Sequence, residues 1–103
     1  MNTSPTDLAI AEAQSVTVSE DVLTVELADG RTITVPISWY PRLVHGTTKE
    51  RRKWELLGGG IGIHWPDLDE DISVQGLLAG RHSGETQVSL QRWLEGRAKQ
   101  RPA

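Results

Sequence analysis

An acidic run that follows a histidine holds the densest set of side chains able to do chemistry. Asp67, Asp69 and Asp71 occupy alternate positions, which is how a calcium loop begins, with carboxylate oxygens that converge on a hard cation. The rest of that pattern is absent, because isoleucine and leucine stand where such a loop needs glycine and a bidentate glutamate. We therefore predict no metal and no other cofactor; if a metal were bound, His64, Asp67 and Asp69 would be its ligands.

A structural role is the stronger interpretation of the same carboxylates. They can cap a following helix and complement the partial positive charge at its N-terminus, or they can pair with Arg31 or Arg42. His64, oriented by a neighbouring aspartate, could act as a general base, but no nucleophile motif accompanies it in the sequence. We expect no enzymatic activity, and the alternative is a metal- or ligand-binding enzyme centred on His64 and residues 67–71.

A compact basic patch precedes this segment and suggests a second kind of binding. Lys49, Arg51, Arg52 and Lys53 lie next to Trp54, and their phosphate contacts together with base stacking would suit RNA or single-stranded DNA. The chain as a whole has a net charge of -3 at pH 7, whereas nucleic-acid-binding domains are usually basic. We expect a solvated helix face here, and weak nucleic-acid binding by these four basic residues is the second alternative.

Three neighbouring residues, Trp39, Tyr40 and Arg42, form the candidate surface for a protein partner. Aromatic and arginine side chains supply most of the binding energy in protein interfaces. The same rings could instead serve the core, because the sequence has four Trp and no Phe, and we expect at least two of the Trp to be mostly buried. Unpaired strand edges could also join two copies, so the sequence allows a homodimer.

Alternation of apolar and polar residues predicts the elements that position these side chains. Strands are expected at 16–18, 23–27 and 33–35, where valine, leucine and isoleucine recur at every second position. Asp29 and Gly30 favour a tight hairpin turn between the second strand and the third. The simplest arrangement is an antiparallel meander with one buried face.

The middle of the chain predicts a short helix and one more strand. Thr47 and Glu50 fit a capping box, so a helix should begin there and run through Trp54. A glycine-rich turn then leads into a strand over residues 61–65, whose apolar residues share one face.

Two further helices are expected after the acidic run. Ser73 can cap a short helix that ends near Gly80. The last segment, 85–100, has apolar residues at helical spacing and basic residues toward its end. The fold class is therefore α+β: a small antiparallel β-meander with short helices and an amphipathic C-terminal helix.

Length and composition predict one domain in an intracellular setting. A chain of 103 residues can bury one modest core, and we place the domain at 14–100, after a mobile segment at 1–13 and before a tail at 101–103. The absence of cysteine excludes a disulfide framework, and no stretch is apolar enough to span a bilayer. We expect a cytoplasmic protein without membrane association.

Several segments together resemble a bacterial family, the domain of unknown function 2442, over about residues 15 to 95. The resemblance implies a small prokaryotic α+β domain without assigned catalytic residues, sometimes fused to a helix-turn-helix module and often found in toxin–antitoxin-like gene pairs. Here a single helix follows Ser83, which is too little for a helix-turn-helix module. The leading hypothesis is a non-enzymatic, antitoxin-like accessory or regulatory domain that binds a protein, such as a toxin-like partner. The segments that carry the resemblance are Leu23-Thr24-Val25-Glu26-Leu27-Ala28-Asp29-Gly30-Arg31, Pro36-Ile37-Ser38-Trp39-Tyr40-Pro41-Arg42-Leu43 and Gly60-Ile61-Gly62-Ile63-His64-Trp65-Pro66-Asp67-Leu68-Asp69-Glu70-Asp71-Ile72-Ser73.

Overall fold

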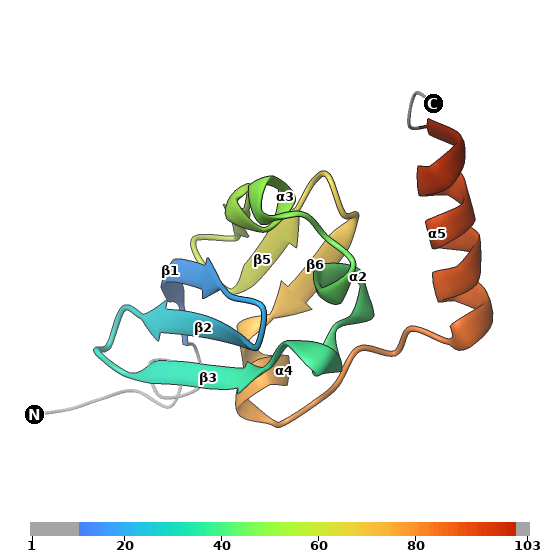
Figure 1. The fold of residues 1–103 in the computed structure, drawn as a ribbon. Helices are drawn as coiled ribbons and strands as arrows, with labels where there is room; N and C mark the ends of the chain where they lie inside the picture. The colour runs from blue at the N-terminus through green and yellow to red at the C-terminus, as the bar shows by residue number, and fades with distance from the viewer. Residues whose placement is uncertain (1–10, 101–103) are drawn as a thin grey trace, which may run out of the picture.

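The alternating residues of the N-terminal half build a three-stranded sheet. The computed structural model, which describes residues 11–100, pairs β1 (Ala13–Val18), β2 (Val22–Leu27) and β3 (Thr32–Pro36) antiparallel in that order (Figure 1). Leu23 and Val25 are fully buried because they share the face that turns toward the core. The predicted meander is confirmed.

A second antiparallel sheet follows, made of β4 (Glu55–Leu57), β5 (Gly62–Trp65) and β6 (Glu70–Ser73) in that order. Strand β5 was predicted, but β4 and β6 were not; the acidic residues of β6 indicated a helix cap. The strand exists because Ile72 pairs with Ile63 on the core face, while the polar residues on either side of Ile72 face away from it. The α+β class therefore includes two small sheets rather than one.

Short helices connect these strands. A 3-10 turn, η1 (Ile37–Trp39), and α2 (Pro41–Val44) follow the first sheet, and α3 (Thr48–Arg52) has the predicted capping box but ends before Trp54. Helix α4 (Val74–Leu78) begins at the predicted cap, where the Ser73 hydroxyl accepts a hydrogen bond from the Gly76 N–H at 2.9 Å. The starts predicted for these two helices from Thr47 and Ser73 are therefore confirmed.

The tip of the β4–β5 hairpin joins the two sheets. The Ala13 N–H donates to the Gly60 carbonyl at 2.7 Å, and the Val74 N–H donates to the neighbouring Ile61 carbonyl at 3.0 Å. Gly60 has a φ of +115°, and a Cβ placed on it would lie 2.5 Å from the Ala13 carbonyl oxygen. Only glycine suits this position, because the start of β1 passes directly over it.

One hydrophobic core lies between the sheets and the short helices. Trp65 is fully buried, and its indole N–H donates to the Arg51 carbonyl at 3.1 Å, while the other three Trp are partly buried. The buried residues are Ala13, Val16, Leu23, Val25, Leu27, Val35, Ile37, Tyr40, Leu43, Ile63, Trp65, Leu68, Ile72, Val74 and Leu77. The core of this chain, which has no Phe, is therefore made of aliphatic side chains and the rings of Tyr40 and Trp65.

The segment predicted to be mobile, 1–13, overlaps the first strand. Ala13 is buried and paired within β1. Residues 1–10 of that segment and the tail at 101–103 lie outside the described residues. Within residues 11–100, no helix combines the length and hydrophobicity needed to cross a bilayer.

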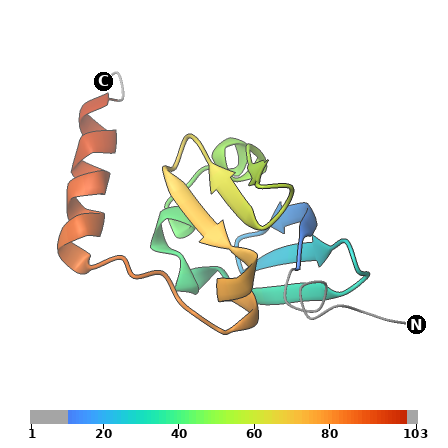
Figure 2. The ribbon, with the colours of Figure 1, turned by 180° about the vertical axis from the view of Figure 1, so that it is seen from behind.

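The C-terminal helix stands beside the domain, with Trp93 packed against the hydrophobic core. Helix α5 (Gln87–Gln100) is reached by an extended connection after α4 and lies to one side in both views (Figures 1 and 2). None of its residues is buried. We use the name arm for residues 85–100, which comprise Glu85, the capping Thr86 and α5.

Candidate functional site

The aspartates of the acidic run do not converge. The Asp71 carboxylate meets His64 Nδ1 at 2.5 Å, Asp67 meets the Lys53 ammonium at 3.3 Å, and Asp69 meets Arg42 at 3.5 Å. The metal set of His64, Asp67 and Asp69 is therefore not brought together, and residues 11–100 contain no group of three such side chains placed to hold an ion. The expected pairing of this run with Arg42 is present, whereas Arg31 pairs with Asp29 instead.

The His64–Asp71 pair lies on the outer face of the second sheet. On this face Glu55, His64 and Asp71 stand side by side across the three strands, while Ile63 and Trp65 point into the core. A carboxylate that orients an imidazole is part of a general-base arrangement, but His64 sits on an open sheet face and is not among the residues that line the pockets described below. The pair joins β5 to β6 on this face.

The basic patch is partly used by the fold. Arg51 donates to the last two carbonyls of α2, from Nε to Leu43 O at 2.8 Å and from Nη2 to Val44 O at 2.9 Å, and so caps that helix. Lys53 is paired to Asp67, so of these four residues Lys49 and Arg52 are the two whose side chains have neither an ion pair nor a hydrogen bond within residues 11–100. The four-residue surface considered for nucleic acid is therefore reduced to one lysine and one arginine.

The predicted partner surface is not a set of three accessible side chains. Tyr40 is a core residue with 5% of its surface exposed, and its hydroxyl donates to the Arg81 carbonyl at 3.1 Å. Trp39 stacks on the His82 ring with a centroid distance of 4.1 Å. Tyr40 cannot serve as a surface anchor, so the prediction narrows to Trp39 and Arg42, which both face the connection to the arm.

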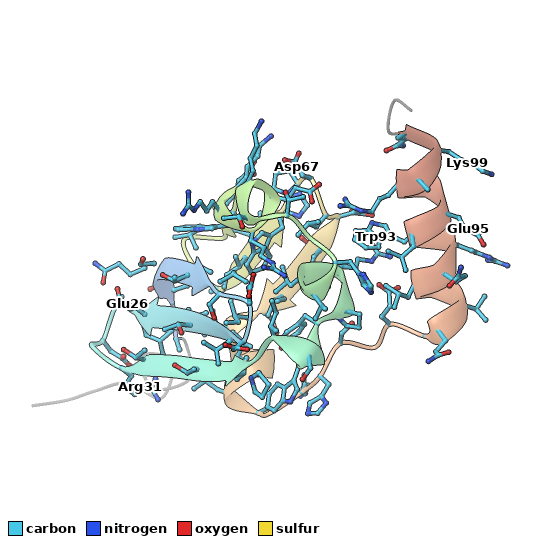
Figure 3. The ribbon with its side chains drawn as sticks, in the orientation of Figure 1. Glu26, Arg31, Asp67, Trp93, Glu95 and Lys99 are labelled. Carbon is cyan, nitrogen blue, oxygen red and sulfur yellow. The ribbon has the colours of Figure 1, made fainter. Side chains whose placement is uncertain are left out.

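Arg42 belongs to a cluster that holds the arm against the domain. Its guanidinium forms two hydrogen bonds to the Glu85 carboxylate, and it lies over the Trp93 ring at 5.2 Å. Arg97 covers the same ring at 4.7 Å and makes two hydrogen bonds to Glu50, at 2.8 and 3.0 Å. Figure 3 shows Trp93 directed from the arm toward the domain, with Glu95 and Lys99 directed away. We call Arg42, Glu50, Glu85, Trp93 and Arg97 the arm seam.

The guanidinium groups of the arm seam lower the pKa of its two carboxyl groups. Hydrogen bonds from Arg97 lower the pKa of Glu50 from 4.5 to about 2, with a further contribution from the Thr47 backbone. Hydrogen bonds from Arg42 likewise lower the pKa of Glu85. Both carboxylates are therefore ionised at neutral pH. The sequence offered one signal for this cluster, since Trp93 and Arg97 lie four residues apart on a helix and share a face.

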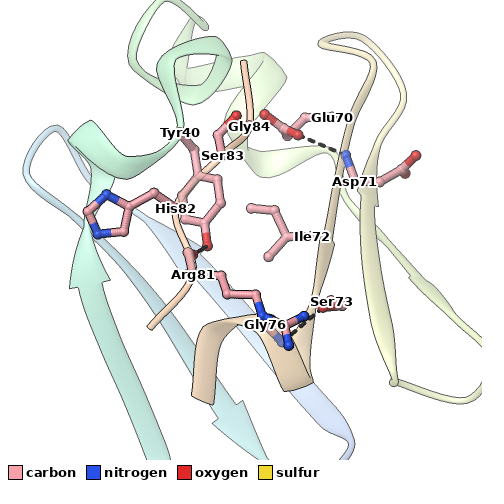
Figure 4. A pocket seen from close by; sticks show the side chains of 10 residues that line it. All are labelled: Tyr40, Glu70, Asp71, Ile72, Ser73, Gly76, Arg81, His82, Ser83 and Gly84. Atoms are coloured by element: carbon pink, nitrogen blue, oxygen red, sulfur yellow. Dashed lines mark hydrogen bonds between the residues drawn. The ribbon is translucent and has the colours of Figure 1, made fainter. Parts of the chain in front are cut away.

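A pocket of about 230 Å³ opens near Tyr40 and contains a second unusual carboxyl group (Figure 4). Glu70 Oε1 accepts from the Asp71 N–H at 3.1 Å, whereas its buried Oε2 has no hydrogen-bond partner among the described residues. Burial raises the pKa of Glu70, and burial together with the Glu70 charge raises that of Tyr40. The pocket is lined by Tyr40, Glu70, Asp71, Ile72, Ser73, Gly76, Arg81, His82, Ser83 and Gly84. It holds no arrangement of nucleophile and base.

The free edge of the second sheet exposes an apolar patch. Leu56 and Leu57, whose side chains leave opposite faces of β4, are 37% and 42% exposed, and Ile61 in the hairpin turn is 52% exposed. These three account for half of the six large exposed apolar side chains in the part of the chain that the structure describes. No described strand pairs with the outer side of β4. We call Leu56, Leu57 and Ile61 the edge patch; the sequence did not predict it, because exposure there depends on the order of the strands in the sheet.

Comparisons with known proteins give a family and a shared fold. The profile of the family described as "Protein of unknown function (DUF2442)" matches residues 13–83. A crystal structure of a protein of unknown function from Rhodospirillum rubrum is 30% identical with a TM-score of 0.62, and the match covers 77% of this chain and 95% of that one. The solution structure of the uncharacterised protein CV0863 from Chromobacterium violaceum is 26% identical with the same TM-score, covering 78% and 75%. No curated protein matches. The profile ends at Ser83, before the arm.

Proposed function

The chain belongs to the family described as Protein of unknown function (DUF2442), and we propose that it acts as a non-enzymatic protein-binding domain, antitoxin-like in role. The edge patch carries the proposal. It combines an unpaired strand edge with exposed apolar side chains, and an extended segment of a partner protein can use both when it pairs with β4 as a fourth strand.

The physical argument starts from the cost of leaving such an edge open. A strand edge presents unpaired N–H and C=O groups, and proteins that keep an edge in solvent usually protect it with charge, proline or a covering element. On β4, Glu55 is the only charged residue, and Leu56 and Leu57 follow it without protection. An exposed apolar strand edge of this kind is typical of an interaction site.

The charges next to β4 favour a partner segment that carries acidic residues. Lys49 and Arg52 on α3 have no ion-pair partner among the described residues and lie just before the strand in the sequence. Opposite charges across an interface speed association and select among partners. We therefore commit to an extended, apolar segment flanked by Asp or Glu. The same two basic residues would contribute only weakly to nucleic-acid binding.

The remaining candidate chemistry gives less support to an enzyme. His64 and Asp71 form a pair on an open face, and Glu70 occupies a pocket whose serine hydroxyls, Ser73 and Ser83, bond to backbone N–H groups and not to a base among the described residues. Neither places two reactive groups around a site for a substrate. An enzyme centred on either group would also leave the exposure of the edge patch without a role, whereas a protein partner would cover it.

The proposal is tested by quantitative capture from a lysate of the native host, with the tagged full chain as bait. Leu57→Lys introduces a charge into the edge patch, and Leu78→Lys on α4 is the matched control, because the two leucines are 42% and 44% exposed. We expect one protein to be enriched at least tenfold by the wild type and by Leu78→Lys but not by Leu57→Lys. Equal capture by all three baits contradicts the proposal.

A second measurement locates the contact. The captured protein is purified and added to the domain, and hydrogen exchange of the backbone amides is followed. We expect new protection at residues 55–57, as strand pairing requires. Protection confined to the arm or to α4, with β4 unchanged, would show that the partner binds elsewhere.

A further inference from the structure

Charged and aromatic contacts dominate the attachment of the arm to its domain. The seam consists of ion pairs, hydrogen bonds and cation–π contacts, with Trp93 as the seam residue that also packs against the hydrophobic core, and no residue of α5 is buried. Open grooves of about 360 and 450 Å³ remain along the boundary between the arm and the acidic turn of the second sheet. A helix of this length is only marginally stable in isolation, so it depends on what covers its apolar face.

The attachment changes abruptly at one residue. Before it, the chain is fixed to the domain: Arg81 O accepts from Tyr40, His82 stacks on Trp39, and the Ser83 N–H donates to Trp39 O at 3.0 Å. After it, the cross-domain polar contacts of the arm go to Arg42 and Glu50. The residue between is glycine at position 84, and a Cβ placed there would meet no atom within 4 Å. Gly84 is therefore an exposed and loosely packed position in the connection, and glycine has the widest choice of backbone angles.

We propose that two copies of this chain exchange their arms about Gly84 and form a two-fold dimer in which each arm seam contains residues of both copies. The receptor for the arm is present on every copy, because Arg42 and Glu50 belong to the domain. It complements the arm in charge: Arg42 faces Glu85 and Glu50 faces Arg97. Exchange of an identical element keeps every such contact and closes a symmetric dimer.

Exchange also adds cover that a single copy lacks. Leu90 and Leu94 share a face of α5 with Trp93 and are only partly covered in one copy. In the proposed dimer the second arm crosses beside this face, and contact between the two arms is what would cover Leu90 and Leu94. The proposal does not rest on the edge patch, which lies on β4 and is untouched by the exchange.

Charge reversal in two separate chains tests the exchange. Glu50→Arg and Arg97→Glu each place like charges across the seam, so each variant alone should elute as a monomer of about the 11.4 kDa chain mass, while the wild type elutes as a dimer. In an equimolar mixture, an exchanged heterodimer pairs Arg97 of the first chain with Glu50 of the second, and the two reversed residues with each other. We expect the mixture to recover the dimer, measured by light scattering after size exclusion.

The outcomes separate exchange from other arrangements. Contacts made within one copy predict that mixing has no effect, because each chain keeps its own like-charge pair. Two results overturn the proposal. The first is a monomeric wild type. The second is a mixture that stays monomeric although the double variant, with Glu50→Arg and Arg97→Glu in one chain, dimerises. Since Glu50→Arg also removes the α3 capping box, the same experiment is repeated with Arg42→Glu and Glu85→Arg. Circular dichroism confirms that each variant is folded, and Leu57→Lys should dimerise like the wild type, so failure of either proposal is seen independently.

Discussion

Replacing Gly60 with alanine should destabilise the domain more than any other glycine replacement in a turn. The Cβ of the new residue would lie 2.5 Å from the Ala13 carbonyl oxygen and 3.0 Å from the Ala13 nitrogen, and both are backbone atoms that cannot rotate away. The φ of +115° is itself unfavourable for a residue with a side chain. The substitution therefore combines backbone strain with a steric clash at the contact that joins the two sheets.

The size of the effect follows from these two contributions. A left-handed backbone conformation costs an L-residue about 1–2 kcal/mol. Forcing an extra carbon into a packed site costs about 1–3 kcal/mol more. Gly30 supplies the matched control, because its φ is +95° and a Cβ there meets no atom within 4 Å. We expect Gly30→Ala to show the first cost alone, and Gly60→Ala to exceed it by about 2 kcal/mol.

Urea denaturation of both variants, followed by far-UV circular dichroism, measures the difference in the free energy of unfolding. Equal destabilisation by Gly60→Ala and Gly30→Ala, within the error of the extrapolation, would refute the steric argument. It would mean that β1 can move away from the hairpin tip at no cost. The inferred junction between the two sheets would then be loose rather than fixed.

Three further predictions concern a cap, a buried hydroxyl and an ion pair. Ser73→Ala should lower the free energy of unfolding by about 1 kcal/mol, because Ser73 and not an aspartate caps α4; Asp71→Ala measured in parallel should cost less. Tyr40→Phe should cost about 1 kcal/mol through loss of the buried hydroxyl hydrogen bond, with no change in the slope of denaturation. Ionised Glu50 stabilises the fold at pH values above its ordinary pKa of 4.5, and this contribution is lost as the pH falls toward the folded-state pKa of about 2. Between pH 4.5 and about pH 2, the wild type should therefore lose more free energy of unfolding than Arg97→Gln does.

Features that depend on neighbouring residues could be predicted from the sequence. The period-two pattern of β1, β2 and β3 is local, and so are the Thr47 capping box and the Ser73 cap. Strand β6 could not be found this way, because its acidic residues have the composition of a cap and its identity depends on pairing with β5. An interaction between strands is invisible to a window of adjacent residues.

The candidate site was predicted less well, for the same physical reason. Tyr40 and Arg42 looked like surface anchors because aromatic and arginine residues favour interfaces. Their actual partners lie 41 and 43 residues away, at Arg81 and Glu85. Long-range contacts of this kind decide whether a side chain is available. The edge patch escaped detection because exposure depends on which strand ends the sheet, and β4 could have been central.

The link between Ala13 and Gly60 also has a consequence for how the protein emerges from the ribosome. The first three strands leave the ribosome early and can pair locally. The Ala13 N–H, however, finds its acceptor only when Gly60 has been made, and the neighbouring Ile61 carbonyl finds its donor only when Val74 has been made. Non-local contacts of this kind slow folding because the chain between them must first be closed into a loop. We therefore expect the nascent first sheet to remain incompletely docked through much of synthesis and to rely on rapid elongation, or on a chaperone, until the second sheet is complete.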